Sequence, residues 1–186
     1  MLLASSVPGP RLTDNSELGA ETELAAGTYE VLRNRLQAQA KALGKIGMPV
    51  YFPRLIPAGS SYCSDNTSLC PVEQGAKGAA YPRAYLLHDK QGVAHYAYRM
   101  TLAINPILGR YYGIQGSTWQ NPPILNSPTG TRFVNGKQLL LYANGSKLSV
   151  VAWRTPQGVY WVSNTLTDDI PNRQLVAIAA SMMKAH

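Results

Sequence analysis

The chain has 186 residues, of which 45% are hydrophobic and 15% charged, and 17 Lys+Arg against 10 Asp+Glu give a formal net charge of +7. This length suits one domain whose core needs no metal, and a chain neither acidic nor dense in charge is not wholly disordered. Its positive charge favours anionic partners, but the basic residues are scattered and form no nucleic-acid-binding motif, so we expect no nucleic-acid partner.

The first twenty residues differ in composition from the rest. Residues 1–20 are rich in Pro, Gly, Ser and Asn and lack periodicity, which indicates a linker or frayed end. Residues 21–186 are expected to form a single domain. Apolar residues at three- and four-residue spacings predict a helix over residues 22–43, ended by Gly44 and Gly47. No segment is long enough to span a membrane, so we expect no membrane insertion by this chain.

Two cysteines, Cys63 and Cys70, lie in a long loop predicted over residues 54–80. The turn-forming residues between them favour a disulfide, which would stabilise the fold by about 2–3 kcal/mol. A zinc half-site and two free thiols are the alternatives, although zinc would need closer pairs and two more ligands. A disulfide implies an extracytoplasmic setting. Because the N-terminus is not a signal peptide, we expect a fragment of a larger exported protein.

Alternating residues and turn signals predict a series of strands after the helix. The predicted strands are residues 48–52, 81–88, 93–104, 110–119, 137–143, 147–154 and 158–164. Asn144-Gly145 predicts a two-residue type I′ hairpin turn. Gly113 and Gly116 predict either a bulge or a close approach of backbone to a neighbour.

The last three strands are apolar on both faces, so both faces must be covered. The pattern assigns Leu139, Leu141, Leu148, Val150 and Trp161 to one face and Leu140, Tyr142, Val151, Trp153, Tyr160 and Val162 to the other. A second helix is predicted to begin near Pro171, with Leu175, Ile178 and Met182 as its apolar stripe. We therefore expect an α+β fold, a single domain in which an N-terminal and a C-terminal helix pack on a curved antiparallel sheet.

The sequence holds no set of catalytic groups. His88, Asp89 and His95 border a turn or lie on a strand, and no nucleophile elbow accompanies them. Asp168 and Asp169 are expected to cap the last helix. Since no phosphate loop, dinucleotide fingerprint or metal-ligand spacing occurs, we expect no catalytic residue, no metal and no cofactor.

Aromatic content points to binding. The chain has 11 Tyr and 3 Trp but only 2 Phe, and Tyr and Trp combine a stacking face with a polar group, which suits sugar rings. The candidate binding residues are Arg99, Tyr112, Gln115, Trp119, Arg154 and Tyr160. The alternative is that such residues belong to the sheet core, which we expect for Trp153 and Trp161.

Several long motifs resemble a known family. In order, MPVYFPRLIPAGSSY, AYRMTL, YYGIQGSTWQNPPIL, VAWRTPQGVYWVSNTL and RQLVAIAASM resemble the C-terminal region of actinobacterial LytR-CpsA-Psr (LCP) proteins. These membrane-anchored extracytoplasmic enzymes transfer cell-wall glycopolymers from polyprenyl-phosphate carriers onto peptidoglycan. In that family the chemistry belongs to a separate upstream domain, no part of which is seen in this sequence, so the resemblance assigns no catalytic residue here. The cysteine loop is a departure that we do not expect in every relative, and its role stays open.

The resemblance implies a non-catalytic extracytoplasmic accessory domain in cell-wall assembly. Its expected partners are an anionic wall glycopolymer or peptidoglycan, or a partner protein, together with the LCP catalytic domain of the full-length protein. Two alternatives stay open. One is a free-standing enzyme acting on cell-wall glycopolymer through His88, His95 or Asp89, and the other is a structural oligomerisation domain.

Overall fold

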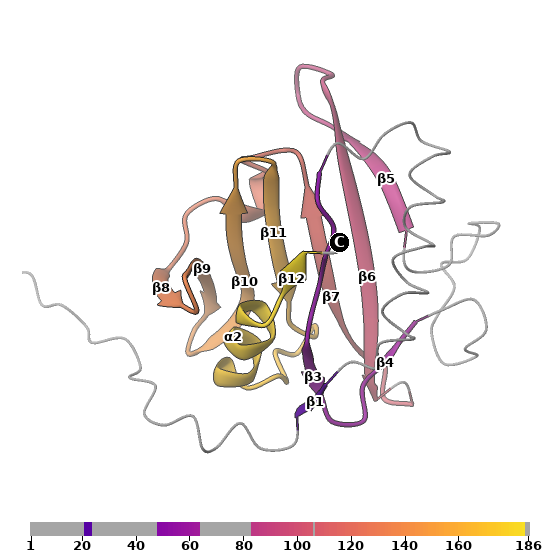
Figure 1. The fold of residues 1–186 in the computed structure, drawn as a ribbon. Helices are drawn as coiled ribbons and strands as arrows, with labels where there is room; N and C mark the ends of the chain where they lie inside the picture. Colours follow the sequence, from indigo (N-terminus) through magenta and orange to yellow (C-terminus); the bar gives the residue numbers. More distant parts are fainter. Residues whose placement is uncertain (1–20, 24–47, 64–82, 106, 185–186) are drawn as a thin grey trace, which may run out of the picture.

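The fold is built on one large curved antiparallel sheet. A computed structural model describes residues 21–23, 48–63, 83–105 and 107–184. Eight strands form the sheet in the order β4-β6-β7-β11-β10-β9-β8, and β5 shares the outer edge of β6 with β4 (Figure 1). Two smaller ladders, β1 with β3 and β2 with β12, join segments distant in the chain.

The elements follow one another closely along the described residues. The strands are β1 (Glu21–Glu23), β2 (Tyr51–Phe52), β3 (Leu55–Pro57), β4 (Ser61–Tyr62), β5 (Arg83–His88), β6 (Ala94–Asn105), β7 (Arg110–Ser117), β8 (Gly130–Val134), β9 (Lys137–Asn144), β10 (Lys147–Thr155), β11 (Gly158–Ser163) and β12 (Met183–Lys184). A short 3-10 helix, η2 (Pro123–Leu125), lies between β7 and β8, and the α-helix α2 (Asn172–Ala180) follows β11.

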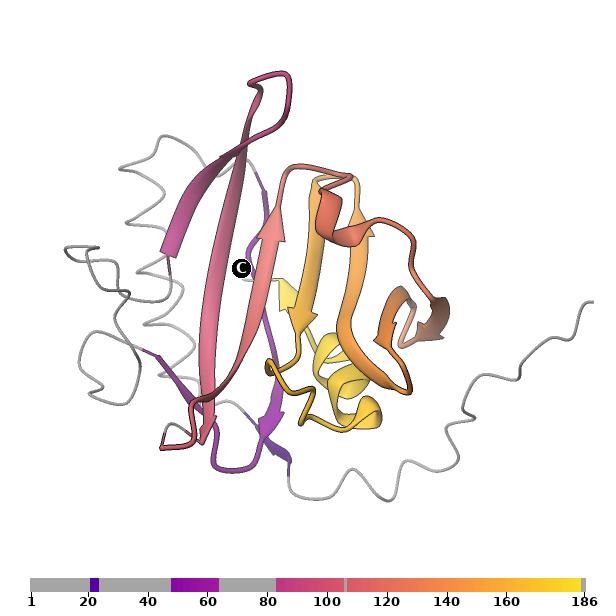
Figure 2. The same ribbon diagram turned by 180° about the vertical axis from the view of Figure 1, so that it is seen from behind.

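The expected α+β fold is wrong, because the described part of the chain is mostly β and contains a single α-helix, at the C-terminal side. Of the helix predicted over residues 22–43, residues 22 and 23 belong to β1, and the rest lies outside the described residues. Helices are not needed to cover both faces. One face is covered by α2 and by the chain from Met48 to Ile56, and the other by the connection that carries η2 (Figure 2).

The C-terminal helix is confirmed close to its predicted position. Pro171 precedes its first residue, and Leu175 and Ile178 are fully buried, with Met182 just beyond the helix also buried. These side chains join the main core, a cluster of buried residues from the large sheet and from the segments that cover this face of it. Its largest fully buried side chains are Phe52, Tyr98, Met100, Leu102, Tyr112, Ile114, Leu139, Tyr160, Leu175 and Ile178, and Trp153 is nearly as buried.

A β-bulge in β10 changes which side chains face the main core. Leu148 pairs with Ala143, but the next pair is Val150 with Tyr142, so Ser149 is an extra residue on β10. Since side chains alternate along a strand, one extra residue reverses the alternation after it. Leu148 therefore lies in the main core, whereas Val150 packs on the opposite face.

The predicted face assignment is wrong beyond this bulge. The main core takes Leu139, Leu141, Leu148, Val151, Trp153, Tyr160 and Val162. The second cluster takes Leu125, Tyr142, Ala152, Val159 and Trp161, with Leu140 and Val150 packed against it. The burial of Trp153 and Trp161, each 3% exposed, is confirmed, and so is their position on opposite faces of the sheet.

Two Asn-Gly pairs form different turns. Asn144 pairs with Lys147, so the β9–β10 loop is Gly145-Ser146, and the positive φ of +61° is at Gly145. The type I′ turn predicted at Asn144-Gly145 is therefore wrong. Such a turn connects β8 to β9 instead, where Asn135 and Gly136 have φ values of 50° and 74°. The prediction overlooked this second Asn-Gly pair and, with it, β8.

The connection between β11 and α2 depends on a buried asparagine rather than on acidic caps. No side-chain hydrogen bond caps α2; Asp169 instead accepts a hydrogen bond from Thr167 and pairs with Arg110 Nε at 3.2 Å. The capping role predicted for Asp168 and Asp169 is therefore wrong. The amide of Asn164 donates to the carbonyls of Leu148 and Ile170 at 2.8 and 3.0 Å. Its Oδ1 also accepts from two backbone N–H groups of the connection.

The predicted close approach at the β7 glycines is confirmed. A Cβ on Gly116 would lie 2.5 Å from Tyr98 Cε1 and 2.7 Å from Tyr160 Cδ1, and both rings are fully buried. A Cβ on Gly113 would lie 2.7 Å from Ser163 Oγ. Strand β7 therefore has room for the two tyrosine rings only where it lacks a side chain.

Gly116→Ala is expected to destabilise the protein by about 2–3 kcal/mol, because neither buried ring can move without disturbing the core. Gly130→Ala is the matched control, since no atom lies within 4 Å of the added Cβ, and we expect a change within about 0.5 kcal/mol. Denaturant unfolding measures both free energies. Equal stability of the two variants would contradict the packing account.

Candidate functional site

The predicted binding residues do not form one groove. Tyr112 and Tyr160 are 2% and 0% exposed and belong to the main core. The Tyr160 hydroxyl donates a hydrogen bond to the Pro49 carbonyl at 2.9 Å, and burial raises the pKa of that hydroxyl. These two tyrosines therefore support the fold and are not available to a ligand at the surface.

Arg99 and Gln115 are cross-strand neighbours on β6 and β7. Both are half-buried and lie on the sheet face opposite the main core, in the same row as Trp161. Neither residue lines the cavity that lies between β9 and β10. Of the six predicted binding residues, Arg154 lines that cavity, and Trp119 is linked to it through Gln120.

The cavity exists because β9 separates from β10. The two strands pair from Asn144 with Lys147 as far as Leu140 with Ala152. Beyond that point, the start of β9 continues beside β8, and the end of β10 continues beside β11. The separation leaves a pocket of about 340 Å³, which we call the β9–β10 pocket. It is lined by Tyr51, Gly136, Lys137, Gln138, Leu140, Trp153, Arg154 and Thr155.

Lys137 is a half-buried cation in this pocket. Its ammonium donates hydrogen bonds to the carbonyl of Ala180, at 3.1 Å, and to that of Met182. It also lies 5.6 Å from the ring centroid of Trp153, within the range of a cation–π contact. Ala180 is the last residue of α2 and Met182 lies two residues beyond it, so the ammonium is at the helix C-terminus, where the dipole favours a positive charge. Nevertheless, burial lowers the pKa of Lys137.

The pocket contains positive charge without negative charge. Lys137 and Arg154 are among its lining residues, and none of those residues is an Asp or Glu. A half-buried ammonium is more stable when an anion lies close to it, because part of its hydration has been lost. The geometry therefore suits an anionic group, with the rings of Tyr51 and Trp153 as apolar walls.

The rim of the pocket is fixed by the chain that follows β7. The guanidinium of Arg154 donates from Nη1 to the Gln120 carbonyl. The Gln120 side chain donates in return to the carbonyls of Thr155 and Pro156, at 3.1 and 3.3 Å. These bonds hold the exposed Arg154 side chain beside the pocket.

Trp119 forms a second cluster with His95 and Asp89, two of the three residues considered for acid–base chemistry. The rings of Trp119 and His95 are stacked, with centroids 5.0 Å apart and an interplanar angle of 12°. His95 Nε2 donates to Asp89 Oδ2 at 3.1 Å, and Asp89 Oδ1 accepts two backbone N–H bonds within the β5–β6 turn. His88 is exposed at the end of β5. Asp89 thus closes a turn and orients a ring that supports an indole.

One of the two cysteines predicted to form a disulfide belongs to the described part of the chain. Cys63 is buried and disulfide-bonded. Cys70, the only other cysteine in the sequence, lies outside the described residues. Within the described ranges, no three His, Cys, Asp or Glu side chains come together to hold a metal ion. Nor is any helix there long and apolar enough to cross a membrane.

Sequence reasoning missed Lys137, Gln138 and Tyr51. Lys137 was predicted to begin a strand, but nothing in the sequence indicates that its side chain reaches the end of α2. No residue pattern in the sequence marks the point at which β9 separates from β10. No family model matches this chain, and no curated protein or solved structure was found to be similar to it.

Asp89→Asn is expected to make stability less sensitive to acid. The His95 hydrogen bond and the backbone N–H groups of the turn lower the pKa of Asp89 below its usual 3.8. A depressed folded-state pKa contributes stability that is present above the unfolded value and lost as pH falls through the folded value. Thermal unfolding of wild type and variant between about pH 5 and pH 2 measures this loss.

The matched control for that series is Asp168→Asn, which removes a loop carboxylate elsewhere. Asp168 has a φ of 51°, a conformation that asparagine tolerates. We expect Asp89→Asn to flatten the acid limb of the stability curve more than Asp168→Asn does. Parallel curves for wild type and Asp89→Asn would show that the hydrogen-bonded carboxylate does not determine acid sensitivity.

Proposed function

We propose that this chain is a non-catalytic, extracytoplasmic accessory module of an LCP-type protein that binds anionic cell-wall polymer in the β9–β10 pocket. The observation that carries the proposal is a pocket lined by two basic residues, the half-buried Lys137 and the exposed Arg154, and by no carboxylate. An anionic glycopolymer or peptidoglycan would supply the missing counter-charge, and its sugar rings would meet aromatic walls.

The setting and the partner domain follow from the same proposal. The disulfide of Cys63 supports an oxidising compartment, and the resemblance of the motifs to the LCP C-terminal region is the reason to place a transferase domain upstream of the module. A polymer held at the pocket would remain close to that domain, which raises its effective concentration at the transferase.

The proposal assigns no reaction to this chain. Asp89 and His95 are hydrogen-bonded to each other, as are the Asp and His of a catalytic triad. However, one carboxylate oxygen is engaged by the turn, and the imidazole is stacked on Trp119. We therefore assign this pair to supporting Trp119.

Binding is tested by titrating the protein with purified wall glycopolymer fragments and, separately, with peptidoglycan fragments at low salt. Lys137→Met and Arg154→Gln are each expected to weaken binding by about 10- to 100-fold, the usual effect of losing a charge-assisted hydrogen bond. Affinity should also fall as salt rises. Thermal unfolding of each variant separates lost contact from lost fold.

Lys147→Gln is the matched control, because Lys147 lies at the opposite end of β10 from Arg154 and is exposed. It removes the same formal charge and should leave the affinity within about 2-fold, the scale of a distant surface charge. Lys137→Arg should retain part of the binding. If neither polymer binds wild type at low salt, or if Lys147→Gln weakens binding as much as Arg154→Gln, the pocket is not the binding site.

A further inference from the structure

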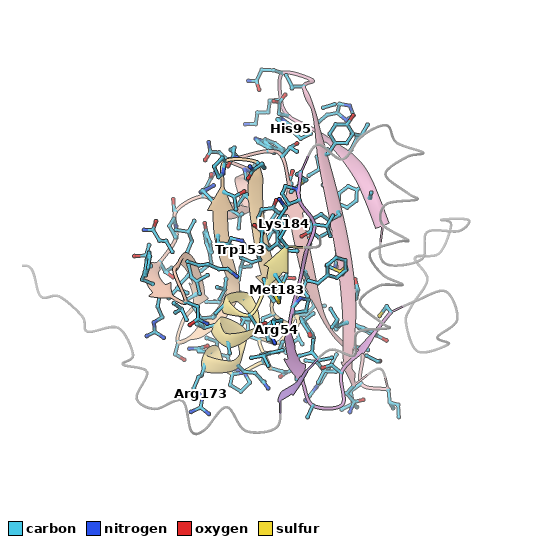
Figure 3. The ribbon with its side chains drawn as sticks, in the orientation of Figure 1. Arg54, His95, Trp153, Arg173, Met183 and Lys184 are labelled. Atoms are coloured by element: carbon cyan, nitrogen blue, oxygen red, sulfur yellow. The ribbon has the colours of Figure 1, made fainter. Side chains whose placement is uncertain are left out.

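A partly exposed tryptophan lies beyond the pocket on the sheet face to which Arg154 points. Trp119 follows β7 by two residues, and the connection that it begins crosses toward the turn between β10 and β11 (Figure 2). His95 lies at the upper end of the sheet in Figure 3, whereas Trp153, in the pocket, lies nearer its centre. The two aromatic positions are therefore separate places on one molecule.

A short series of contacts links Trp119 to the pocket. Gln120, the next residue, bonds through its carbonyl to Arg154 and through its side chain to the Thr155 carbonyl. Both Arg154 and Thr155 line the pocket. The segment that carries the indole is thus fixed directly to the pocket rim.

The spacing follows from the sheet. Ser117 pairs with Val159 on β11, and Val159 pairs with Arg154 on β10, so β7 and β10 are two strand spacings apart. At about 4.8 Å per spacing, the end of β7 and the pocket rim are separated by about 10 Å. That separation is too long for one small anion to contact both, but it suits an extended chain.

Trp119 is held in a fixed orientation before any ligand arrives. Its backbone N–H donates to Ser117 Oγ at 3.1 Å, and its ring is stacked on His95, which Asp89 orients. A rigid aromatic surface loses little conformational entropy when a sugar ring packs on it. The Trp119–His95 stack can stabilise the fold as well as present the indole to a sugar ring, and stability and affinity measurements on the same variant separate these two roles.

We propose that Trp119 is a second subsite and that the ligand is an anionic glycan chain of several units, with an anionic group in the β9–β10 pocket and a sugar ring against Trp119. This inference rests on the proposed binding function and specifies its ligand class. A one-unit fragment reaches only the pocket, whereas a longer fragment reaches both places. Affinity should therefore rise with chain length until both subsites are filled.

The test compares size-fractionated fragments of phosphate-bearing wall glycopolymer, of one repeat unit and of several, by calorimetric titration of the intact protein. Trp119→Ala is expected to weaken binding of the longer fragments by about 3- to 10-fold and to leave one-unit binding unchanged. Trp119→Phe should restore most of the loss. Lys137→Met, in contrast, should weaken binding of every length.

A control variant and the pattern of outcomes separate the possible roles of Trp119. Leu166→Ala removes a fully exposed apolar side chain in the β11–α2 connection and should change neither affinity. The Trp119–His95 ring stack is purely structural if Trp119→Ala lowers the thermal midpoint while long and short fragments bind as in wild type. The second subsite is also overturned if Trp119→Ala weakens the binding of short and long fragments equally, or if the wild type binds long fragments no more tightly than short ones. Neither result contradicts binding in the β9–β10 pocket. If Lys137→Met has no effect on any length, the proposed function itself fails.

Discussion

The extra residue at Ser149 determines which groups meet around the pocket. Without the bulge, the alternation of β10 would place Trp153 on the face opposite the main core and Arg154 against that core. With the bulge, Trp153 joins Leu139 and Leu141, on the face where Lys137 reaches the end of α2. One residue in one strand thus sets the aromatic wall of the pocket and turns a guanidinium toward the surface.

The pocket combines two requirements that usually conflict. Half-burial of Lys137 costs hydration free energy, yet the carbonyls of Ala180 and Met182 and the ring of Trp153 keep the ammonium in place. These partners are dipoles and a quadrupole rather than full negative charges, so they orient the cation without neutralising it. A group held in this way remains available to an anion.

Much of the strand pattern could be predicted from the sequence, because alternation and turn residues act locally. The strands around Gly92, Gly145 and Pro156 were found this way, and so was the apolar stripe of α2. The faces of β10 were not, since a bulge leaves no mark in the alternation of a strand that is apolar on both sides. Nor was the pocket, which depends on where β9 turns from β10 toward β8. Arg154 and Trp119 were predicted from residue type, whereas burial removed Tyr112 and Tyr160 from the candidates.

The β2–β12 ladder has a consequence for folding. Tyr51 lines the pocket, and among the described residues its strand pairs with Met183 and Lys184, more than a hundred residues later in the sequence. Closing so long a loop costs chain entropy that only tertiary contacts formed afterwards can offset. Hairpins such as β9–β10 form from neighbouring residues and need no such closure. The wall at Tyr51 therefore forms through contacts between segments distant in the sequence, with β12 and with the rings of Trp153 and Tyr160.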